Sequence, residues 1–455
     1  MVEHVHFIGV GGSGMSGVAE IALRRGWRVS GSDLVASATT ARLEQLGVRV
    51  FIGHDPRHIS GAHRVVVSSA VKPDNPERRA AQERGIPVIH RAAMLAELMA
   101  GKTAITIAGT HGKTTTSAMV FSLLRAAKAD PTAVIGAALD GIGGGAVAGD
   151  GCCFVAEADE SDGSFLLLPR DIAVVTNIDR DHLDFYRDLD AITDHFVRFA
   201  EGVPDAGLVV ACADDPGVQR FLPRLTKRTV LYGLTAPNVH LRAAELASEK
   251  PFGWTFIIRH ATDRLGRVRL QVPGRHAVLN ALAAVAIGLE LGIGFEAIQV
   301  GLEMFKNASR RFQIRGEKNN VLVIDDYGHH PVEIAAVLDA ARKTERRIVL
   351  VFQPHRYSRT RHLFADFVTA LGGADVACIV DVYAAGEAPI TGVTSAALAA
   401  ALQAAGHPAT YYVGDLEAAL PAVVALTRPG DVLLTVGAGD VWRLGERFLG
   451  HAEVA

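Results

Sequence analysis

The residues best suited to chemistry lie in one glycine-rich stretch. They follow a β-branched run at residues 104–108 and precede a helix-forming segment: Gly109, Thr110, His111, Gly112, Lys113, Thr114 and Thr115. Backbone N–H groups and Lys113 of such a loop can hold phosphates, and the hydroxyl of Thr114 can reach Mg²⁺. Ile107 replaces the first glycine of the usual G-x-x-x-x-G-K-[ST] pattern, so a chance turn is the alternative. The strand-loop-helix context favours a nucleotide site.

Two more β-branched runs end in groups that suit a metal-nucleotide site. The run at residues 154–157 ends in Glu157, and His182 follows the run at residues 172–176. Because the carboxyl ends of parallel strands share one edge of a sheet, we expect both side chains beside the phosphate loop. Carboxylate oxygens and an imidazole there suit Mg²⁺ bridging an ATP tail. Three other acids of this region fit solvated turn charges better: Asp159, Asp162 and Asp179.

A second glycine loop lies near the N-terminus. A buried run at residues 5–9 leads into the G-x-G-x-x-G pattern of residues 9–14, and Asp33 follows about 20 residues later, as in dinucleotide folds. The residues that could cradle a diphosphate are Gly11, Gly12, Ser13 and Gly14. The pattern alone leaves three alternatives open: a nicotinamide or flavin cofactor, another diphosphate, or a tight turn without a ligand.

The last third of the chain carries a third set of polar groups at run ends. Two acids, a tyrosine and two histidines precede Pro331: Asp325, Asp326, Tyr327, His329 and His330. Such a concentration at a strand end favours a site over a structural role. Arg356 and Arg359 follow the run at residues 348–352, and a planar guanidinium is a natural partner for an α-carboxylate. Surface exposure is the alternative for these arginines. Tyr383, Glu387 and Asp440 are further strand-end candidates without a derived role.

The elements that must position these groups are typical of an α/β fold. Short β-branched runs alternate with glycine-rich turns and Ala/Leu-rich stretches, which indicates βαβ units on parallel sheets. Because nucleotide-type loops restart the pattern, we predict three domains, at residues 1–101, 102–308 and 309–455. Residues 227–272 carry strand-like patches between charged turns, and we expect a small β-rich insert there, within the middle domain.

Length, charge and cysteine content limit the partners. A chain of 455 residues is too long for one core, and its formal charge of -3 gives no reason to expect nucleic acid or an anionic membrane. The four cysteines show neither metal-ligand spacing nor the density of a disulfide scaffold. No segment approaches the roughly 20 apolar residues of a membrane span, and the start lacks a signal-peptide pattern. We expect a cytoplasmic protein that acts on small molecules, with its oligomeric state open.

Taken together, these stretches resemble the Mur ligase family over nearly the whole chain. The resemblance rests on residues 109–115, 157–165, 176–182 and 274–281. Within the family, residues 9–15, 325–331 and 352–360 are most similar to the branch that adds L-alanine to UDP-N-acetylmuramate. The resemblance implies an N-terminal Rossmann-like UDP-binding domain without nicotinamide, a central P-loop ATPase-like domain and a C-terminal Rossmann-like domain for the amino acid.

The resemblance also implies roles for single residues. Gly11, Gly12, Ser13, Gly14 and Asp33 would bind the UDP-sugar. Two Mg²⁺ ions are implied, one on Thr114 and Glu157 and the other near His182. The remaining implied contacts are His276, Asn280 and Asp326 for ATP, Tyr327, His329, Arg356 and Arg359 for the amino acid, and Arg311 for the phosphates or the acyl intermediate.

The expected reaction follows from the chemistry of a carboxylate, which must be activated before an amine can displace its oxygen. The lactyl carboxylate would attack the γ-phosphate of ATP, with Lys113 and Mg²⁺ neutralising charge, and an acyl phosphate would form. L-Alanine would then expel phosphate, with His329 orienting or deprotonating its amine. An acyl phosphate must be kept from water, so we predict domain closure about a hinge at residues 307–311.

Two departures from the family pattern and three rival functions complete the expectations. No lysine occurs in residues 181–200, where later Mur ligases carry a carbamylated one, and Phe196 lies about there; this fits the L-alanine-adding branch. Ala277 stands where many members have Asn, so an adenine-side contact is in question. The rivals are a ligase that attaches a recycled tripeptide to the same UDP-sugar, a Rossmann-type oxidoreductase, and a non-catalytic nucleotide-binding module.

Overall fold

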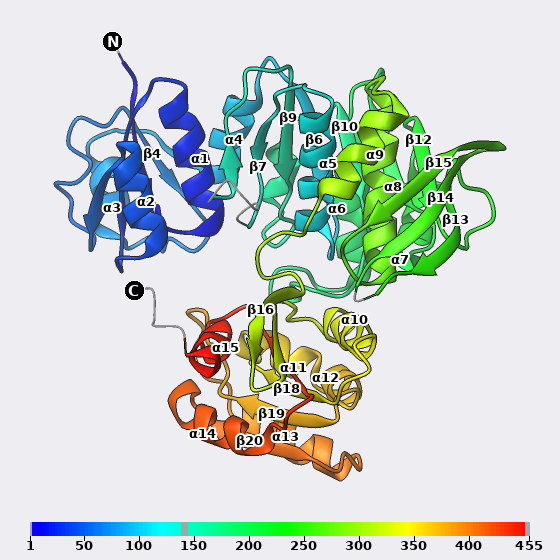
Figure 1. Cartoon of the computed structure of the whole chain (residues 1–455). Coiled ribbons are helices and arrows are strands. Elements are labelled where there is room, and N and C mark those ends of the chain that lie inside the picture. The colour runs from blue at the N-terminus through cyan, green and yellow to red at the C-terminus, as the bar shows by residue number, and fades with distance from the viewer. Residues whose placement is uncertain (1, 138–143, 251, 451–455) are drawn as a thin grey trace.

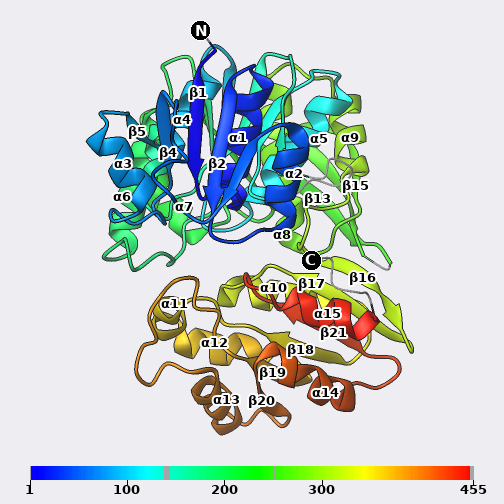
Figure 2. The same cartoon turned by 90° about the vertical axis from the view of Figure 1, so that its left-hand side faces the viewer.

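The computed structural model describes residues 2–137, 144–250 and 252–450, apart from the side chain of Ser13. Three α/β units follow one another along the chain, and each has its own sheet. Figure 1 shows the N-terminal unit in blue beside the central unit in cyan to green, with the C-terminal unit in yellow to red below them. In Figure 2 the N-terminal unit lies in front of the central unit, and the C-terminal unit lies below both.

The N-terminal unit has a parallel sheet of order β3-β2-β1-β4-β5. Its strands are β1 (His4–Ile8), β2 (Arg28–Asp33), β3 (Arg49–Ile52), β4 (Arg64–Val67) and β5 (Val88–His90), and its helices are α1 (Ser13–Arg24), α2 (Ala38–Leu46), α3 (Pro76–Glu83) and α4 (Arg91–Met99). The central strand β1 is buried along its whole length, as its run of apolar residues predicts. The strand order reverses beside β1, so the first glycine loop opens at the switch point of the sheet, where such folds bind ligands.

The central unit has a ten-stranded sheet of order β15-β14-β13-β12-β11-β10-β6-β9-β7-β8. The strands that surround the phosphate loop are β6 (Thr103–Ala108), β9 (Cys153–Glu157), β10 (Ile172–Val175) and β11 (Leu208–Cys212), with β7 (Thr132–Val134) and β8 (Ala146–Val147) at one edge. The helices are α5 (Lys113–Ala126), α6 (Leu189–Glu201), α7 (Pro216–Phe221), α8 (Arg275–Glu290) and α9 (Phe295–Met304). Two single 3-10 turns, η1 (Ser164–Leu167) and η2 (Leu222–Arg224), complete the unit.

The β-rich segment expected at residues 227–272, within the middle domain, is present. It contains β12 (Thr229–Gly233), β13 (Leu241–Ser248), β14 (Trp254–His260) and β15 (Asp263–Leu270). Strand β12 pairs parallel with β11 and with β13, and β13, β14 and β15 are joined antiparallel. The segment therefore continues the central sheet, because β12 offers a free edge to which the β13–β15 meander adds.

The C-terminal unit has a six-stranded sheet of order β16-β17-β21-β18-β19-β20. Only β16 (Gln313–Lys318) is antiparallel to its neighbour; the parallel strands are β17 (Val321–Asp326), β18 (Ile348–Phe352), β19 (Val376–Val380), β20 (Thr410–Gly414) and β21 (Val432–Val436). The helices are α10 (Pro331–Arg342), α11 (Tyr357–His362), α12 (Phe364–Leu371), α13 (Ser395–Ala404), α14 (Leu416–Leu426) and α15 (Trp442–Leu449).

The N-terminal and central units share an apolar core, whereas the C-terminal unit has cores of its own. One apolar cluster runs from the N-terminal unit into the central one, from Val5 to Phe221, whereas two clusters on the two faces of the C-terminal sheet belong almost wholly to that unit. The α/β fold with parallel sheets in three units is thus confirmed, including every strand that the sequence predicts. Among the described helices, none combines the length and the apolar character that crossing a membrane requires.

Candidate active site

The phosphate loop is fixed to the end of β10 by backbone contacts. The N–H of Thr110 donates to the carbonyl oxygen of Asn177 at 3.1 Å, and the N–H of His111 donates to the Asn177 side chain at 2.7 Å. Gly109 has a φ of +137°, and a Cβ there would lie 2.0 Å from Oγ1 of Thr176, so only glycine allows this approach. Helix α5 then begins directly after Gly112, which leaves its N-terminal N–H groups facing the loop.

Lys113 lies within this loop and faces acidic side chains. Its Nζ donates to the carbonyl oxygen of Gly109 at 2.6 Å and pairs with Glu160 at 2.9 Å. Burial alone would lower the pKa of Lys113, but the nearby carboxylates of Glu160, Asp159 and Glu157 outweigh it, and the pKa is raised. The lysine therefore carries its positive charge at neutral pH, as a group that neutralises phosphates must.

The predicted metal ligands Thr114 and Glu157 are brought together. Oγ1 of Thr114 lies 3.1 and 3.0 Å from the two carboxylate oxygens of Glu157, and the N–H of Gly136 donates to the same carboxylate at 2.8 Å. A hydroxyl and a carboxylate beside a phosphate loop are hard oxygen donors, so the residues fit Mg²⁺. Both side chains border the larger of the two cavities described below.

His182 lies on the far side of Glu160 and does not border that cavity. Its Nε2 is 3.6 Å from Glu160 and 3.6 Å from Asp181. Its φ is +53°, which is uncommon for a residue with a side chain and aims the imidazole at these carboxylates. Nζ of Lys113 lies close to both oxygens of the buried Glu160, at 3.0 Å from Oε1 and 2.9 Å from Oε2. An imidazole beside buried carboxylates offers donors that fit a second divalent ion.

A cavity of about 300 Å³ opens between the central and C-terminal units, on one side of the phosphate loop. It is bordered by His276, Ala277 and Asn280 of α8 and by Asp326 at the end of β17. Burial lowers the pKa of His276, so this imidazole is neutral, and burial raises the pKa of Asp326 to about 6. Ala277 is buried and adds apolar surface, which suits a flat heteroaromatic base better than a phosphate.

A second cavity of about 380 Å³ lies on the other side of the loop and is bordered by all three units. The N-terminal unit contributes Gly14 and Arg91, the central unit Lys113, Thr114 and Glu157, and the C-terminal unit Arg311, Tyr327 and His329. Three regions that are far apart in the sequence thus meet in one space, which we call the reaction cavity.

The N-terminal glycine loop reaches the reaction cavity through Gly14. A Cβ on Gly14 would lie 1.7 Å from Nη1 of Arg91, so the guanidinium rests directly on the loop. Asp33 accepts a hydrogen bond from the N–H of Gly11 at 2.8 Å, which shows that its carboxylate holds the loop itself. Gly12 precedes α1 as its N-cap, and the side chain of Ser13 lies outside the described part of the structure.

The expected amino-acid pocket is assembled in part. Burial lowers the pKa of His329 to about 4, and its Nδ1 donates to the carbonyl oxygen of Tyr327 at 3.1 Å. Arg359 is engaged elsewhere: its Nε and Nη2 donate to the two oxygens of Asp181, at 3.1 Å each. The pair joins the central and C-terminal units, and Arg359 holds the pKa of Asp181 below its usual range although burial alone would raise it. Arg356 contacts Asp184 at 3.2 Å.

The segment that leads into the C-terminal unit contains Arg311, which was singled out from the sequence, and its neighbour Arg310. Arg310 is fully used by Asp325 and by the carbonyl oxygens of Gly437 and Gly439. Arg311 lies over the ring of Tyr327, with 5.2 Å between its Cζ and the ring centre, and borders both cavities. Arg311 is therefore the one placed to reach a substrate.

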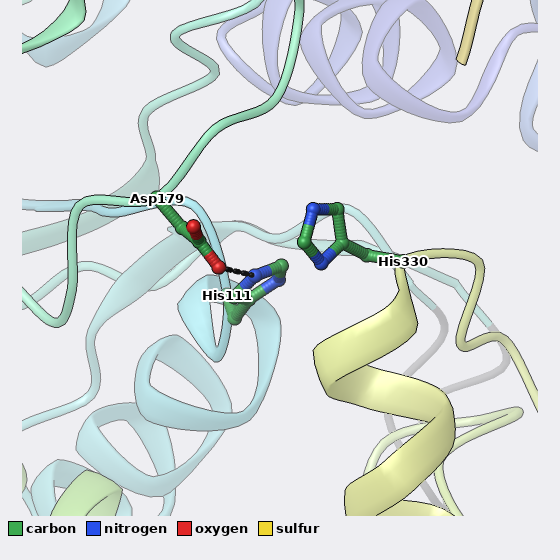
Figure 3. Close-up of side chains that lie close together, drawn as sticks. All are labelled: His111, Asp179 and His330. Atoms are coloured by element: carbon green, nitrogen blue, oxygen red, sulfur yellow. Dashed lines mark ion pairs between the residues drawn. The ribbon is translucent and has the colours of Figure 1, made fainter. Parts of the chain in front are cut away.

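The turn acids need one correction. Asp162 accepts a hydrogen bond from Ser69 of the N-terminal unit, and Asp179 lies 3.5 Å from Nε2 of His111, so neither is simply a solvated turn charge. His111, Asp179 and His330 form a cluster whose potential ligand atoms lie within 4.8 Å of one another (Figure 3). Asp162 is explained by a contact with the N-terminal unit and Asp179 by a contact with the phosphate loop of its own unit, and the spacing within one strand end could not indicate either contact.

Several site residues could not be singled out from the sequence. Arg91 opens α4 and Asn177 follows β10, and both contact a glycine loop. Glu333 on α10 touches His111, 222 residues earlier in the chain. Its position three residues after His330 indicated only a helix cap. The remaining strand-end candidates have structural partners: Glu387 binds Ser358, Asp440 binds Gln353, and Tyr383 stacks on His355.

Comparison with known proteins agrees with this geometry. Three family models match successive parts of the chain: "Mur ligase family, catalytic domain" at residues 4–103, "Mur ligase middle domain" at residues 107–288, and "Mur ligase, glutamate ligase domain" at residues 310–439. A UDP-N-acetylmuramate--L-alanine ligase of Geobacter sp. (strain M21) is 51% identical over 450 residues, covering 98% of this chain and 97% of the relative. That of Geobacter sulfurreducens is 49% identical over 458 residues, covering 100% and 98%.

Solved structures extend the similarity to three dimensions. A UDP-N-acetylmuramate-alanine ligase from Thermotoga maritima has a TM-score of 0.84 at 30% identity, covering 98% of each chain. A murein peptide ligase from Psychrobacter arcticus shares the fold, with a TM-score of 0.74 at 22% identity and full coverage of both chains. With three family models in order along the chain and half of its residues identical to those of full-length relatives, this chain belongs to the Mur ligase family.

Proposed function

We propose that the protein is an ATP-dependent ligase that joins L-alanine to the lactyl carboxylate of UDP-N-acetylmuramate, with ADP and phosphate as the other products. The observation that carries the proposal is the reaction cavity, in which a phosphate loop, a diphosphate-type glycine loop and a histidine-bearing strand end meet. The curated relatives with about 50% identity bear the name of this activity. Peptidoglycan precursor synthesis is the process that such a product serves.

The first step is the transfer of a phosphoryl group to the sugar carboxylate. The apolar cavity beside Ala277 accepts the adenosine part of ATP, with His276, Asn280 and Asp326 at its border. The triphosphate then follows the loop into the reaction cavity, where Lys113 neutralises charge on the transferring group. The UDP part of the sugar lies on residues 11–14, and Arg91 adds a positive charge where that loop meets the cavity.

Thr114 and Glu157 would hold one Mg²⁺, and we propose that His182, with the nearby Glu160, would hold a second ion. When bound, such ions would neutralise charge on the phosphoryl oxygens. Gly136 holds the Glu157 carboxylate in place from the outside. Lys113 and His182 contact Glu160 from two sides, so this one buried carboxylate positions both groups.

The second step is attack by the amine of L-alanine on the acyl phosphate. Because Nδ1 of His329 donates to the Tyr327 carbonyl oxygen, its Nε2 carries the lone pair and can accept a proton of the incoming amine. Its lowered pKa, about 4, makes it a weak base, so we assign it the orientation of the amine. Arg356 and Arg359 are proposed to attract the α-carboxylate, with Asp181 fixing the plane of the Arg359 guanidinium. Arg311 faces the phosphates.

We assign the UDP-sugar to residues 1–101, ATP to residues 102–308 and the amino acid to residues 309–455. A hinge between the last two units is supported by left-handed backbone at three non-glycine residues of the connection: Asn307 with φ +115°, Arg310 with φ +58° and Phe312 with φ +45°. The largely separate core of the C-terminal unit allows it to move as one body. We place the enzyme in the cytoplasm, where ATP is available and the four free cysteines stay reduced.

Phosphate release tests the proposal. Purified protein receives ATP, Mg²⁺ and UDP-N-acetylmuramate together with either L-alanine or the tripeptide L-Ala-γ-D-Glu-meso-diaminopimelate. We expect release with L-alanine and none without the sugar substrate. Release only with the tripeptide would assign the protein to the recycling branch, and nucleotide binding without release would leave it a binding module.

A further inference from the structure

Glu333 contacts both functional halves of the site, yet no step above uses it. Its side chain is 15% exposed and borders both cavities. Oε1 lies 3.1 Å from Nδ1 of His111 in the phosphate loop. Oε2 accepts the N–H of His329 at 2.9 Å and the N–H of His330 at 3.2 Å. One carboxylate therefore bridges the ATP loop and the strand end that faces the amino acid.

Helix capping explains only half of these contacts. Helix α10 begins with a capping box, in which the N-cap is His330 and the third helical residue is Glu333. That motif requires one oxygen on the backbone N–H of the N-cap, and Oε2 supplies it. The other oxygen is directed at a histidine of another domain, 222 residues earlier in the chain. A cap alone does not need this second contact.

His111 is held between two acids, so its position follows both of them. Its Nε2 faces Asp179 at 3.5 Å, as Figure 3 shows, while its Nδ1 faces Glu333. Burial alone would lower the pKa of His111, but these acids raise it to about 9, and the ring is an imidazolium at neutral pH. The contact between the phosphate loop and α10 is thus a charge-assisted hydrogen bond, which is stronger than a neutral one.

His329 depends on the same carboxylate. Its backbone N–H is held by Oε2 of Glu333, and its ring Nδ1 lies 3.6 Å from that oxygen. The ring also donates to the Tyr327 carbonyl oxygen, so its orientation is set by these two neighbours. A shift of the Glu333 carboxylate would therefore remove one of the two contacts that set the orientation of the imidazole.

We propose that Glu333 is a positioning residue that couples the phosphate loop to the amino-acid pocket, because one of its oxygens binds His111 and the other holds His329. The inference rests on the proposed function and deepens it. Nucleotide in the loop fixes His111, which fixes Glu333 and so preorganises His329. By reciprocity, the amino acid in its pocket strengthens nucleotide binding by the same factor.

The test separates the two half-reactions in the full-length enzyme. Glu333→Gln keeps the volume and an oxygen for the cap but removes the charge that holds His111. Oxygen scrambling in [β,γ-bridge-¹⁸O]ATP, with UDP-N-acetylmuramate and without L-alanine, reports reversible acyl phosphate formation. Steady-state phosphate release reports kcat and the KM for L-alanine. Thr394→Ala is the matched control, because it removes the N-cap of α13 in the same domain without touching the site.

We expect Glu333→Gln to scramble oxygen within threefold of wild type and to raise the KM for L-alanine about 10- to 100-fold, the range for a lost hydrogen bond to a charged partner. Thr394→Ala lowers thermal stability and leaves that KM unchanged. An increase below threefold in Glu333→Gln, or a parallel loss of scrambling, overturns the proposal and leaves Glu333 a helix cap or a part of the loop alone.

A double-mutant cycle gives an independent readout. If His111 and Glu333 act as a unit, His111→Asn with Glu333→Gln raises the KM for L-alanine no further than the more damaging single change. Multiplicative effects would contradict the coupling. Failure of the proposed function is recognised separately, because the wild-type enzyme would then neither scramble ATP with UDP-N-acetylmuramate nor release phosphate with L-alanine.

Discussion

Replacing Asp181 by alanine tests how the C-terminal unit is held against the central one. The carboxylate of Asp181 accepts hydrogen bonds from Nε and Nη2 of Arg359, each at 3.1 Å, and both side chains are 7% exposed. The pair crosses the boundary between the two units. Without the carboxylate, Arg359 is left buried and unpaired, unless the units separate and water reaches it.

The structure provides a matched control for the size of the effect. Asp184 and Arg356 form a second pair across the same boundary, at 3.2 Å, but their side chains are 45% and 36% exposed. Removing one partner of a buried pair costs about 3–5 kcal/mol, whereas an exposed pair contributes roughly 0–1 kcal/mol. Asp181→Ala should therefore shift the balance between closed and open arrangements about 100- to 1000-fold or more, and Asp184→Ala less than about 5-fold.

Small-angle scattering of the two variants with ATP and UDP-N-acetylmuramate measures this balance. We expect a larger radius of gyration for Asp181→Ala and curves like those of wild type for Asp184→Ala. The KM for L-alanine should rise in the first variant, because Arg359 loses the partner that fixes its plane. Superimposable curves for all three proteins would refute the reasoning, since the buried pair would then not hold the units together.

Three further predictions concern single side chains. Lys113→Met should lower turnover in the phosphate-release assay by about 100- to 1000-fold with the circular dichroism unchanged, and near-normal turnover would remove Lys113 from the mechanism. Gly14→Ala should raise the KM for UDP-N-acetylmuramate and leave that for ATP unchanged, because its Cβ would lie 1.7 Å from Nη1 of Arg91. The raised pKa of His111, about 9 against 6.5 in the unfolded chain, stabilises the fold below pH 6.5, and this stabilisation is lost as the pH rises to 9. The free energy of unfolding of His111→Asn, measured by thermal unfolding, should therefore fall less than that of wild type between pH 6.5 and 9, with a difference of at most about 3 kcal/mol. Parallel curves of stability against pH for the two proteins would contradict the raised pKa of His111.

The sequence predicts the fold and the strand-end groups well, for a physical reason. Parallel strands buried on both faces are continuous apolar runs, and their carboxyl ends share one edge, so the loop at residues 109–115 and Glu157 had to lie together. The extension of the central sheet by β13 to β15 was not foreseen, because strand-like patches do not indicate which sheet edge they join. The pairing of β13 with β12 determines which edge the three strands join.

Contacts between domains are the part that the sequence could not predict. Arg359 and Asp181 pair although they are 178 positions apart in the sequence, and Glu333 contacts His111 although 222 positions separate them. The position of Arg359 after a strand suited a substrate carboxylate. In the structure, two nitrogens of its guanidinium already donate hydrogen bonds to the carboxylate of Asp181. Likewise, Asp33 was expected to bind the UDP-sugar, and the sequence did not indicate that its carboxylate also holds the N–H of Gly11. Local patterns indicate which groups are reactive, while tertiary packing decides what they touch.

Transfer of labelled oxygen tests the central claim most directly. UDP-N-acetylmuramate carrying ¹⁸O in its lactyl carboxylate is incubated with the enzyme, ATP, Mg²⁺ and L-alanine, and the phosphate is examined by mass spectrometry. Activation through an acyl phosphate predicts one ¹⁸O atom in inorganic phosphate for each amide bond formed, with ADP as the nucleotide product. Unlabelled phosphate, or label in AMP, would contradict the account.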